Sequence, residues 1–210
     1  RDVSDFVVVT IGSGIGCGIV ANGNFYYGYS GAAGEFGHIK VTEDGPICEC
    51  GKRGCLEALA AEPAIVRKVL ECIKLGEEST LRKVLFQNRE ITIEDVLKAA
   101  KEGDSLAQRI YHSAGTYLGM GIANLVNIIN PQRVIVSGEG LRAGELLTSP
   151  MIKAFQENCF PSIKDVTELV IEPLGDDAWA RGAASLVIEE IFKAKAFIYK
   201  NGKLRVTLYR

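Results

Sequence analysis

The stretch HIKVTEDGPICECGKRGC, residues 38–55, decides how this chain of 210 residues folds. One imidazole and three thiols in a single short segment suit the tetrahedral coordination of zinc. The candidate ligands are His38, Cys48, Cys50 and Cys55. Gly51 and Gly54 let the backbone turn tightly enough for three thiolates to converge. Four protein ligands close the coordination sphere, so we predict a structural zinc ion that activates no water. The alternative is a loop of reduced cysteines without a metal.

Short apolar runs and glycine turns precede this loop and predict several strands, the last of which overlaps the start of the loop. A β-branched run, FVVVTI at residues 6–11, predicts a buried strand. Four glycines between Gly12 and Gly18 predict a tight turn, and Asn22-Gly23 is typical of a hairpin. The further strands expected here are 17–20, 24–27 and 38–41.

Helical periodicity begins after Leu56 and alternates with strands to the end of the chain. The predicted helices are 63–75, one beginning at Thr92, 105–129 ahead of Pro131, one after Gly140, and 177–192. The predicted strands are 133–136, 169–171, 197–200 and 203–206. Leading strands followed by alternating helices and strands indicate an α/β fold with a mixed sheet, in one domain.

Composition excludes several classes of protein. The chain is 47% hydrophobic and 24% charged, with a formal net charge of -2, which gives no basic face for nucleic acid. No apolar run approaches the roughly 18 to 20 residues that span a bilayer. No signal peptide opens the sequence, and the cysteines form no disulfide framework. We therefore expect a cytoplasmic protein with no membrane partner.

The segments GAAGEFGH (31–38) and CECGKRGCLE (48–57) resemble the ROK family of repressors and sugar kinases. TIGSGIGCG, NIINP and DDAWARGAA extend this resemblance over nearly the whole chain. It implies an actin-like ATPase or sugar kinase fold, which is ribonuclease H-like, with two lobes around a sugar cleft. Residues 1–210 look like the second, larger lobe, with a zinc loop at 38–57 and a C-terminal extension at 193–210.

The resemblance also implies roles for particular residues. Glu35, His38 and Glu57 correspond to positions that contact sugar in the family. A carboxylate can accept two hydrogen bonds from neighbouring hydroxyls, and one nitrogen of a metal-bound imidazole remains available to a ligand. The family's catalytic base, the aspartate of an Asn-Asp pair, belongs to the first lobe, so we expect no catalytic residue in this chain. The first lobe and any helix-turn-helix domain would lie outside these residues.

Two functions follow, and the first is favoured. This chain would be the sugar-sensing and oligomerisation part of a transcriptional regulator of carbohydrate genes. It would bind a monosaccharide or sugar phosphate, form a homodimer or larger oligomer, and reach DNA only through an absent N-terminal domain. In kinases of the family, adenosine approaches a glycine run at this position, and the carboxylate of Glu139 here disfavours ATP. The cationic C-terminal tail resembles that of the family's regulators.

The alternative is a fragment of an ATP-dependent hexose or N-acylhexosamine kinase. ATP and magnesium would then be needed. The phosphates would lie on backbone N–H groups of the glycine turns, and the positions concerned would be Thr10, Gly12, Gly14 and Gly138.

Overall fold

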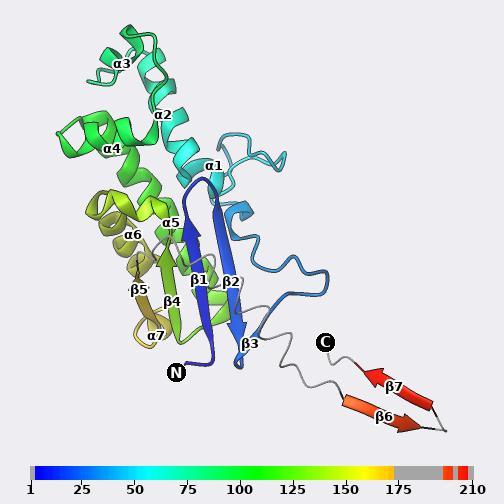
Figure 1. Cartoon of the computed structure of the whole chain (residues 1–210). Coiled ribbons are helices and arrows are strands. Elements are labelled where there is room, and N and C mark those ends of the chain that lie inside the picture. Colours follow the sequence, from blue (N-terminus) through cyan, green and yellow to red (C-terminus); the bar gives the residue numbers. More distant parts are fainter. Residues whose placement is uncertain (1–2, 173–195, 201–202, 208–210) are drawn as a thin grey trace. The chain divides into compact units, whose positions relative to one another are not determined.

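A five-stranded mixed sheet organises the computed structural model, which describes residues 3–172, 196–200 and 203–207 (Figure 1). The strand order is β3-β2-β1-β4-β5. The strands are β1 (Phe6–Ile11), β2 (Ile15–Ala21), β3 (Asn24–Phe25), β4 (Arg133–Ser137) and β5 (Glu168–Ile171). β1 pairs antiparallel with β2 and parallel with β4, and β5 continues the parallel side. The predicted mixed sheet is confirmed.

The central strand β1 shows why this sequence forms a sheet. Its side chains alternate between the core and the half-buried face, and Val7, Val9 and Ile11 are buried. Alternation with period two is the pattern of a strand with one face on a core. The turn after β2 uses Asn22 and Gly23, both with positive φ, as a tight two-residue hairpin requires.

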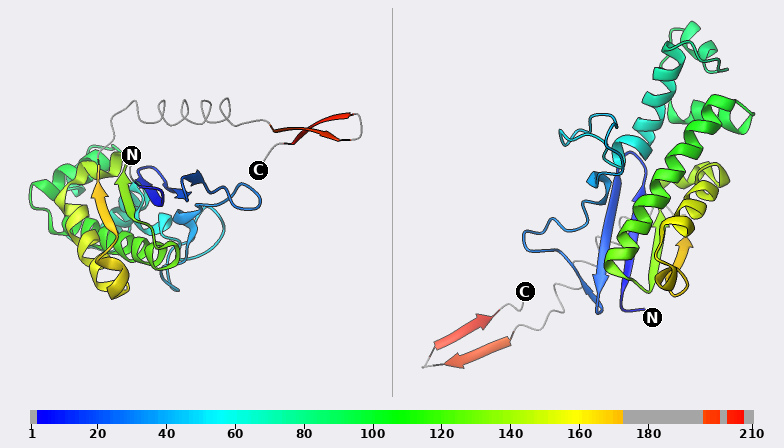
Figure 2. Two further views of the ribbon diagram at one scale, coloured as in Figure 1. Left: turned by 90° about the horizontal axis from the view of Figure 1, so that it is seen from below. Right: turned by 180° about the vertical axis from the view of Figure 1, so that it is seen from behind.

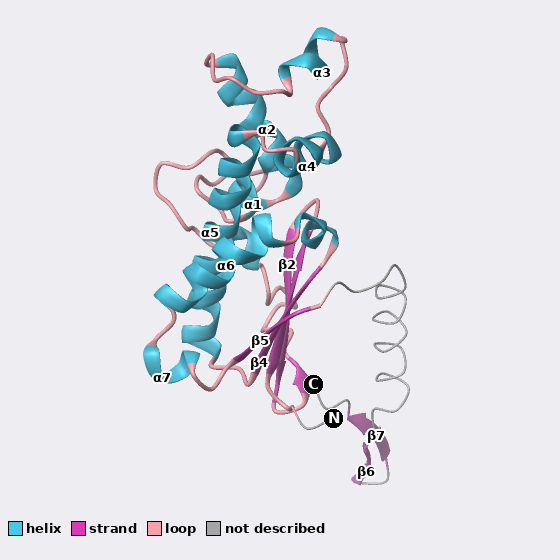
Figure 3. Cartoon of the chain, turned by 90° about the vertical axis from the view of Figure 1, so that its left-hand side faces the viewer, coloured by secondary structure: helices cyan, strands magenta, loops and turns pink. Residues whose placement is uncertain are grey.

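The helices form two groups. They are α1 (Glu57–Ala60), α2 (Glu62–Lys74), α3 (Arg82–Phe86), α4 (Ile93–Lys101), α5 (Ser105–Ile129), α6 (Glu145–Asn158) and α7 (Pro161–Lys164). Short 3-10 helices η1 (Phe36–His38) and η2 (Glu139–Ala143) precede α1 and α6. Helices α5 and α6 lie against one face of the sheet (Figure 3). Helices α2, α3 and α4 extend beyond the carboxyl end of β1 (Figures 1 and 2).

Helix α5 runs over the residues that the sequence predicts. Asp104 caps its start by accepting from the backbone N–H of Ala107, and Asn130 ends it in the left-handed conformation before Pro131. Gly115 and Gly119 let α6 approach closely, because an added Cβ would lie 2.3 and 2.2 Å from the carbonyl oxygens of Leu147 and Met151. The expected close helix contact is present.

One expected strand is wrong, and another, 24–27, is limited to Asn24–Phe25. Residues 38–41 form no strand, because His38 ends the 3-10 helix η1 and pairing is limited to a single bridge between Lys40 and Cys55. Gly37 contacts the strand β2 too closely for any side chain, since its added Cβ would lie 2.4 Å from the carbonyl oxygen of Ile15. The chain therefore packs across β2 here without extending the sheet.

Residues Leu174–Arg210 form a second unit of the chain. Its two described strands, β6 (Ala196–Lys200) and β7 (Lys203–Thr207), pair antiparallel, as the alternation in the tail predicts. The helix expected at 177–192 lies outside the described residues. Among the helices that are described, none is long and apolar enough to cross a membrane.

Candidate metal and sugar site

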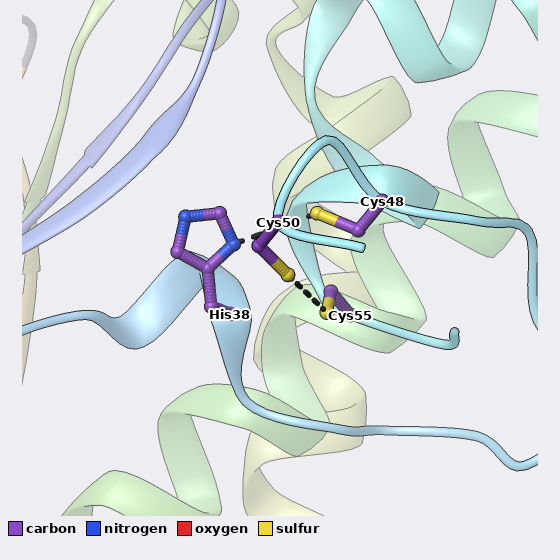
Figure 4. A group of neighbouring side chains, drawn as sticks. All are labelled: His38, Cys48, Cys50 and Cys55. Atoms are coloured by element: carbon purple, nitrogen blue, oxygen red, sulfur yellow. Dashed lines mark hydrogen bonds between the residues drawn. The ribbon is translucent and has the colours of Figure 1, made fainter. Parts of the chain in front are cut away.

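The four predicted ligands come together in one loop between η1 and α1 (Figure 4). The ligand atoms of His38, Cys48, Cys50 and Cys55 all lie within 4.8 Å of one another. His38 Nδ1 is 3.5 Å from Cys48 Sγ, and Cys50 Sγ is 3.6 Å from Cys55 Sγ. Corners of a tetrahedron with metal–sulfur bonds of about 2.3 Å are separated by roughly 3.8 Å. The donor set and its spacing therefore fit a tetrahedral metal ion.

Backbone pairing holds the loop in this shape. Bridges join Lys40 to Cys55 and Ile47 to Arg53. Cys48 donates its N–H to the carbonyl of Lys52, and Leu56 donates to Ile39. These bonds fold the loop back on itself at the ligand positions.

The predicted role of the two loop glycines is also visible. Gly51 and Gly54 have φ values of 85° and 75°. At Gly54 a Cβ would lie 1.8 Å from the Thr42 carbonyl oxygen, so only glycine fits.

The thiols of the loop differ in how readily they lose a proton. Burial, followed by hydrogen bonds with Cys50 and Cys48, raises the pKa of the Cys55 thiol to about 12. A hydrogen bond from the Lys52 backbone lowers the pKa of the exposed Cys50 thiol. Three sulfur atoms this close can all be thiolates only when a positive ion lies among them.

His38 presents its two ring nitrogens in different directions. Nδ1 faces Cys48, whereas Nε2 lies 3.7 Å from the carboxylate of Glu35. The side chain of Glu35 is 68% exposed and that of His38 is 31% exposed. The structure thus brings two of the three expected sugar-contacting residues together on the outer side of the metal cluster.

The third residue, Glu57, begins α1 and connects the metal loop to the glycine turn. Its Oε2 accepts a 3.0 Å hydrogen bond from the backbone N–H of Ile15. An added Cβ would lie 3.0 Å from Oε2 at Gly14 and 3.2 Å from it at Gly37. A side chain at Gly14 would displace this carboxylate, whereas Gly37 is required because an added Cβ would lie 2.4 Å from the Ile15 carbonyl oxygen. Ser13, Gly14 and Glu57 share a hollow of about 280 Å³ with Cys48 and Glu49. Ser13 lies within the TIGSGIGCG turn but was not among the predicted site residues.

The glycine turn itself is closed by hydrogen bonds to its own backbone and to α2. Gly12 donates to the carbonyl of Gly14, and its own carbonyl accepts from the N–H of Glu62. Thr10 lies at the end of β1 and pairs with Ser137, directly before Gly138. Gly138 has φ of 105°, and an added Cβ would lie 2.3 Å from the Ile11 carbonyl oxygen. The expected phosphate-binding positions thus meet at one edge of the sheet.

Glu139 points at this turn. Although the residue is exposed, its Oε2 lies 3.7 Å from where a Cβ of Gly12 would be. A fixed negative charge beside the turn opposes the approach of phosphate.

A cavity of about 480 Å³ lies next to Gly140 of η2. Across it Arg142 pairs with Glu62 at 3.0 Å and with Glu94 at 3.7 Å, and apolar side chains with Tyr111 complete the wall.

Comparison with known proteins identifies the family to which this chain belongs. The family model described as ROK family matches residues 1–190. A glucokinase of Halalkalibacterium halodurans is 38% identical over 187 residues, which is 89% of this chain and 57% of that protein. The N-acetylglucosamine repressor of Escherichia coli O6:H1 is 37% identical over 166 residues, which is 75% of this chain and 40% of that protein. The chain spans about half the length of these relatives.

Solved structures give the same result. A ROK family transcriptional regulator, a homologue of the E. coli MLC protein, superposes with a TM-score of 0.75 at 35% identity, over 87% of this chain and 45% of that one. A ROK family glucokinase from Streptomyces griseus, in complex with glucose and AMPPNP, superposes with a TM-score of 0.73 at 29% identity, over 89% of this chain and 61% of that one. The expected sugar kinase fold is confirmed, and this chain belongs to the ROK family.

Proposed function

We propose that this chain is the zinc-holding, sugar-binding lobe of a ROK transcriptional regulator. The observation that carries the proposal is the convergence of His38, Glu35 and Glu57 on one metal loop. His38 Nε2 lies outward beside Glu35, while Glu57 is held by the backbone of the glycine turn. Carboxylate and imidazole groups fixed in this way suit the chelation of neighbouring sugar hydroxyls.

Zinc would act here as a structural clamp. Four ligands leave no open position for water or substrate, so the ion would do no chemistry itself. Its function would be to fix His38 in one tautomer and to position α1, which begins two residues after Cys55.

Regulation would follow from linked equilibria. A sugar that binds one arrangement of the two lobes more tightly shifts the population toward that arrangement. The DNA affinity of a helix-turn-helix domain elsewhere in the protein would change by the same coupling free energy. A homodimer or larger oligomer is expected, and one of the relatives is named as an N-acetylglucosamine repressor.

Sugar binding can be tested by calorimetry on the full-length protein with glucose, N-acetylglucosamine and xylose. Hydrogen bonds to a charged group contribute about 1.5–3 kcal/mol, so Glu57→Gln should weaken binding of the preferred sugar by roughly tenfold or more. Glu43→Gln, which removes an exposed carboxylate from the same loop, should leave affinity unchanged. Equal affinities for Glu57→Gln and the wild type would refute the sugar role.

A kinase remains the second candidate because of the cavity beside Gly140. Its volume of about 480 Å³ and its apolar wall could receive a nucleoside, and the S. griseus relative was solved with AMPPNP. The carboxylate of Glu139 beside Gly12 argues against nucleotide binding. If that charge excludes nucleotide, Glu139→Gly should strengthen AMPPNP binding about tenfold. Robust ATP consumption by the unmodified full-length protein with any of these sugars would favour the kinase.

A further inference from the structure

A second hollow, of about 440 Å³, lies between the first part of the metal loop and helices α2 and α5. We call it the arginine pocket. Four cationic side chains line it, namely Arg53, Arg67, Lys68 and Arg109. Its two carboxylates are Asp44 and Glu71. Arg109 is paired with Glu77, which does not line the pocket, so the cations exceed the carboxylates by one when that pair is counted, although the whole chain has a formal net charge of -2. The chain thus gathers positive charge around one concave site.

These cations keep hydrogen-bond donors for a ligand. The carboxylate of Glu71 forms ion pairs with both Arg67, at 3.9 Å, and Lys68, at 3.5 Å. Among the interactions of the described residues, Arg53 makes one long hydrogen bond, 3.4 Å, to the carbonyl of Gly45. A guanidinium carries five N–H donors, so most of those on Arg53 and Arg67 remain for an acceptor. Ser113 and Tyr117 add hydroxyl groups to the same wall.

Arg67 connects this pocket to the candidate sugar site. It is the one charged side chain among those lining both the arginine pocket and the hollow that contains Glu57. Its guanidinium donates a 2.5 Å hydrogen bond to the carbonyl of Ala58, the residue after Glu57 in α1. A ligand that recruits Arg67 would therefore act directly on the helix that carries Glu57.

We propose that the arginine pocket binds a small molecule bearing a phosphate group. Planar guanidinium groups match the geometry of phosphate oxygens and can hold them by paired hydrogen bonds. The concave shape and the volume suit a small molecule. Glu57 does not line the pocket, which shares only Ala58, Ala64 and Arg67 with the hollow that contains Glu57, so we treat it as a site distinct from the candidate sugar site.

The proposal can be tested without sugar, so its failure would not bear on the proposed function. The metal-loaded protein is titrated with inorganic phosphate and, separately, with pyrophosphate, at constant ionic strength in a calorimeter. We expect saturable binding, tighter for pyrophosphate, which Arg67→Gln weakens at least tenfold. Lys68→Gln should weaken it by a smaller factor, and it serves as the second variant because Lys68 is largely exposed and makes no backbone bond.

The matched control is Arg133→Gln. Arg133 pairs with Glu168 across β4 and β5 and lines neither hollow, so its loss should leave phosphate affinity unchanged. Circular dichroism and metal content establish that each variant is folded. The proposal is overturned if the wild type shows no saturable binding of either anion, if Arg67→Gln and Lys68→Gln bind as the wild type does, or if Arg133→Gln weakens binding equally. Binding of an acidic peptide alone, without phosphate binding, would also overturn it.

Discussion

The helix pair α5–α6 and the metal loop lie in the same unit but are held together by different physics. Helix α5 is buried along its length, and α6 approaches it so closely that Gly115 and Gly119 contact carbonyl oxygens of the partner helix. The metal loop has no regular strand or helix between His38 and Leu56. Its small buried cluster contains Cys48, Cys55 and Ala58, two of which are candidate metal ligands.

The difference indicates which part of the molecule would depend on a bound ion. Burial of apolar area stabilises α5–α6 whether or not a metal is present. The loop buries little, so a bound metal would supply most of the free energy that orders it. The two regions still meet, because Gly121 of α5 leaves space for Phe36 and Leu56 at the two ends of the loop. We therefore expect the loop to lose order locally when the metal is removed, on an intact helical base.

The largest effect should follow removal of a metal ligand. Cys50→Ala should lower bound zinc from one equivalent per chain to below about a tenth, because three ligands cannot close a tetrahedral site. Cys50 is exposed, so the change creates no cavity in the core. Elemental analysis measures the metal, and far-ultraviolet circular dichroism should show the helices retained.

Cys17→Ala is the control for this experiment, since it removes a half-buried thiol outside the cluster. It should keep the full equivalent of zinc. Collapse of helical signal together with metal loss in Cys50→Ala would contradict the independence of the two regions.

A smaller effect, and the opposite pattern, should follow a change in the helix pair. At Gly119 an added Cβ would lie 2.2 Å from the Met151 carbonyl oxygen and 2.8 Å from the backbone nitrogen of Phe155. Backbone atoms cannot rotate away, so Gly119→Ala must push the helices apart. Overpacking costs about 1–3 kcal/mol, and the better helix propensity of alanine offsets part of this.

We expect Gly119→Ala to lower Tm by roughly 4–8 °C while zinc content stays at one equivalent. Gly18→Ala, with no atom within 4 Å of its added Cβ, should leave Tm nearly unchanged. A Gly119→Ala protein that melts like the wild type would show that the close helix contact contributes little.

The same contrast explains what could be predicted from the sequence. Strand β1 and helix α5 follow local rules, so their boundaries were predictable. β1 is a short apolar run with alternating burial. Helix α5 begins after Asp104, which caps it, and ends before Pro131. The metal ligands were recognisable because thiols and an imidazole cluster within one segment.

Other features depend on tertiary contacts, which local sequence patterns do not predict. Residues 38–41 look like a strand, but they pair only through a single bridge between Lys40 and Cys55. The extent of α6 was hidden by Pro150, which lies inside the helix and packs on Gly115. Arg67 was missed as well, since its place between two hollows depends on how α2 packs on the loop.

The smallest effect concerns Asp104, which joins the start of α5 to the segment before α3. It is 7% exposed and accepts from the backbone of Ala107 and from the backbone and hydroxyl of Thr80. Burial opposes its ionisation, but these hydrogen bonds, with one from Ser79, outweigh burial and lower its pKa. A lowered pKa in the folded state stabilises the protein above the ordinary carboxyl pKa of about 3.9, and that stabilisation is lost as pH falls through the folded value.

Asn caps a helix as well as Asp, so Asp104→Asn removes mainly the charge, at a cost of about 1 kcal/mol. Urea unfolding should show this deficit at pH 7, and the deficit should shrink as pH falls below about 4 and on toward the lowered folded pKa, because the wild-type carboxyl then takes up a proton. Acid also releases metal from the loop, but it does so equally in both proteins, so the difference between them reports Asp104 alone. A deficit that stays constant from pH 7 to pH 3 would mean that the amide disturbs packing and that the charge contributes nothing.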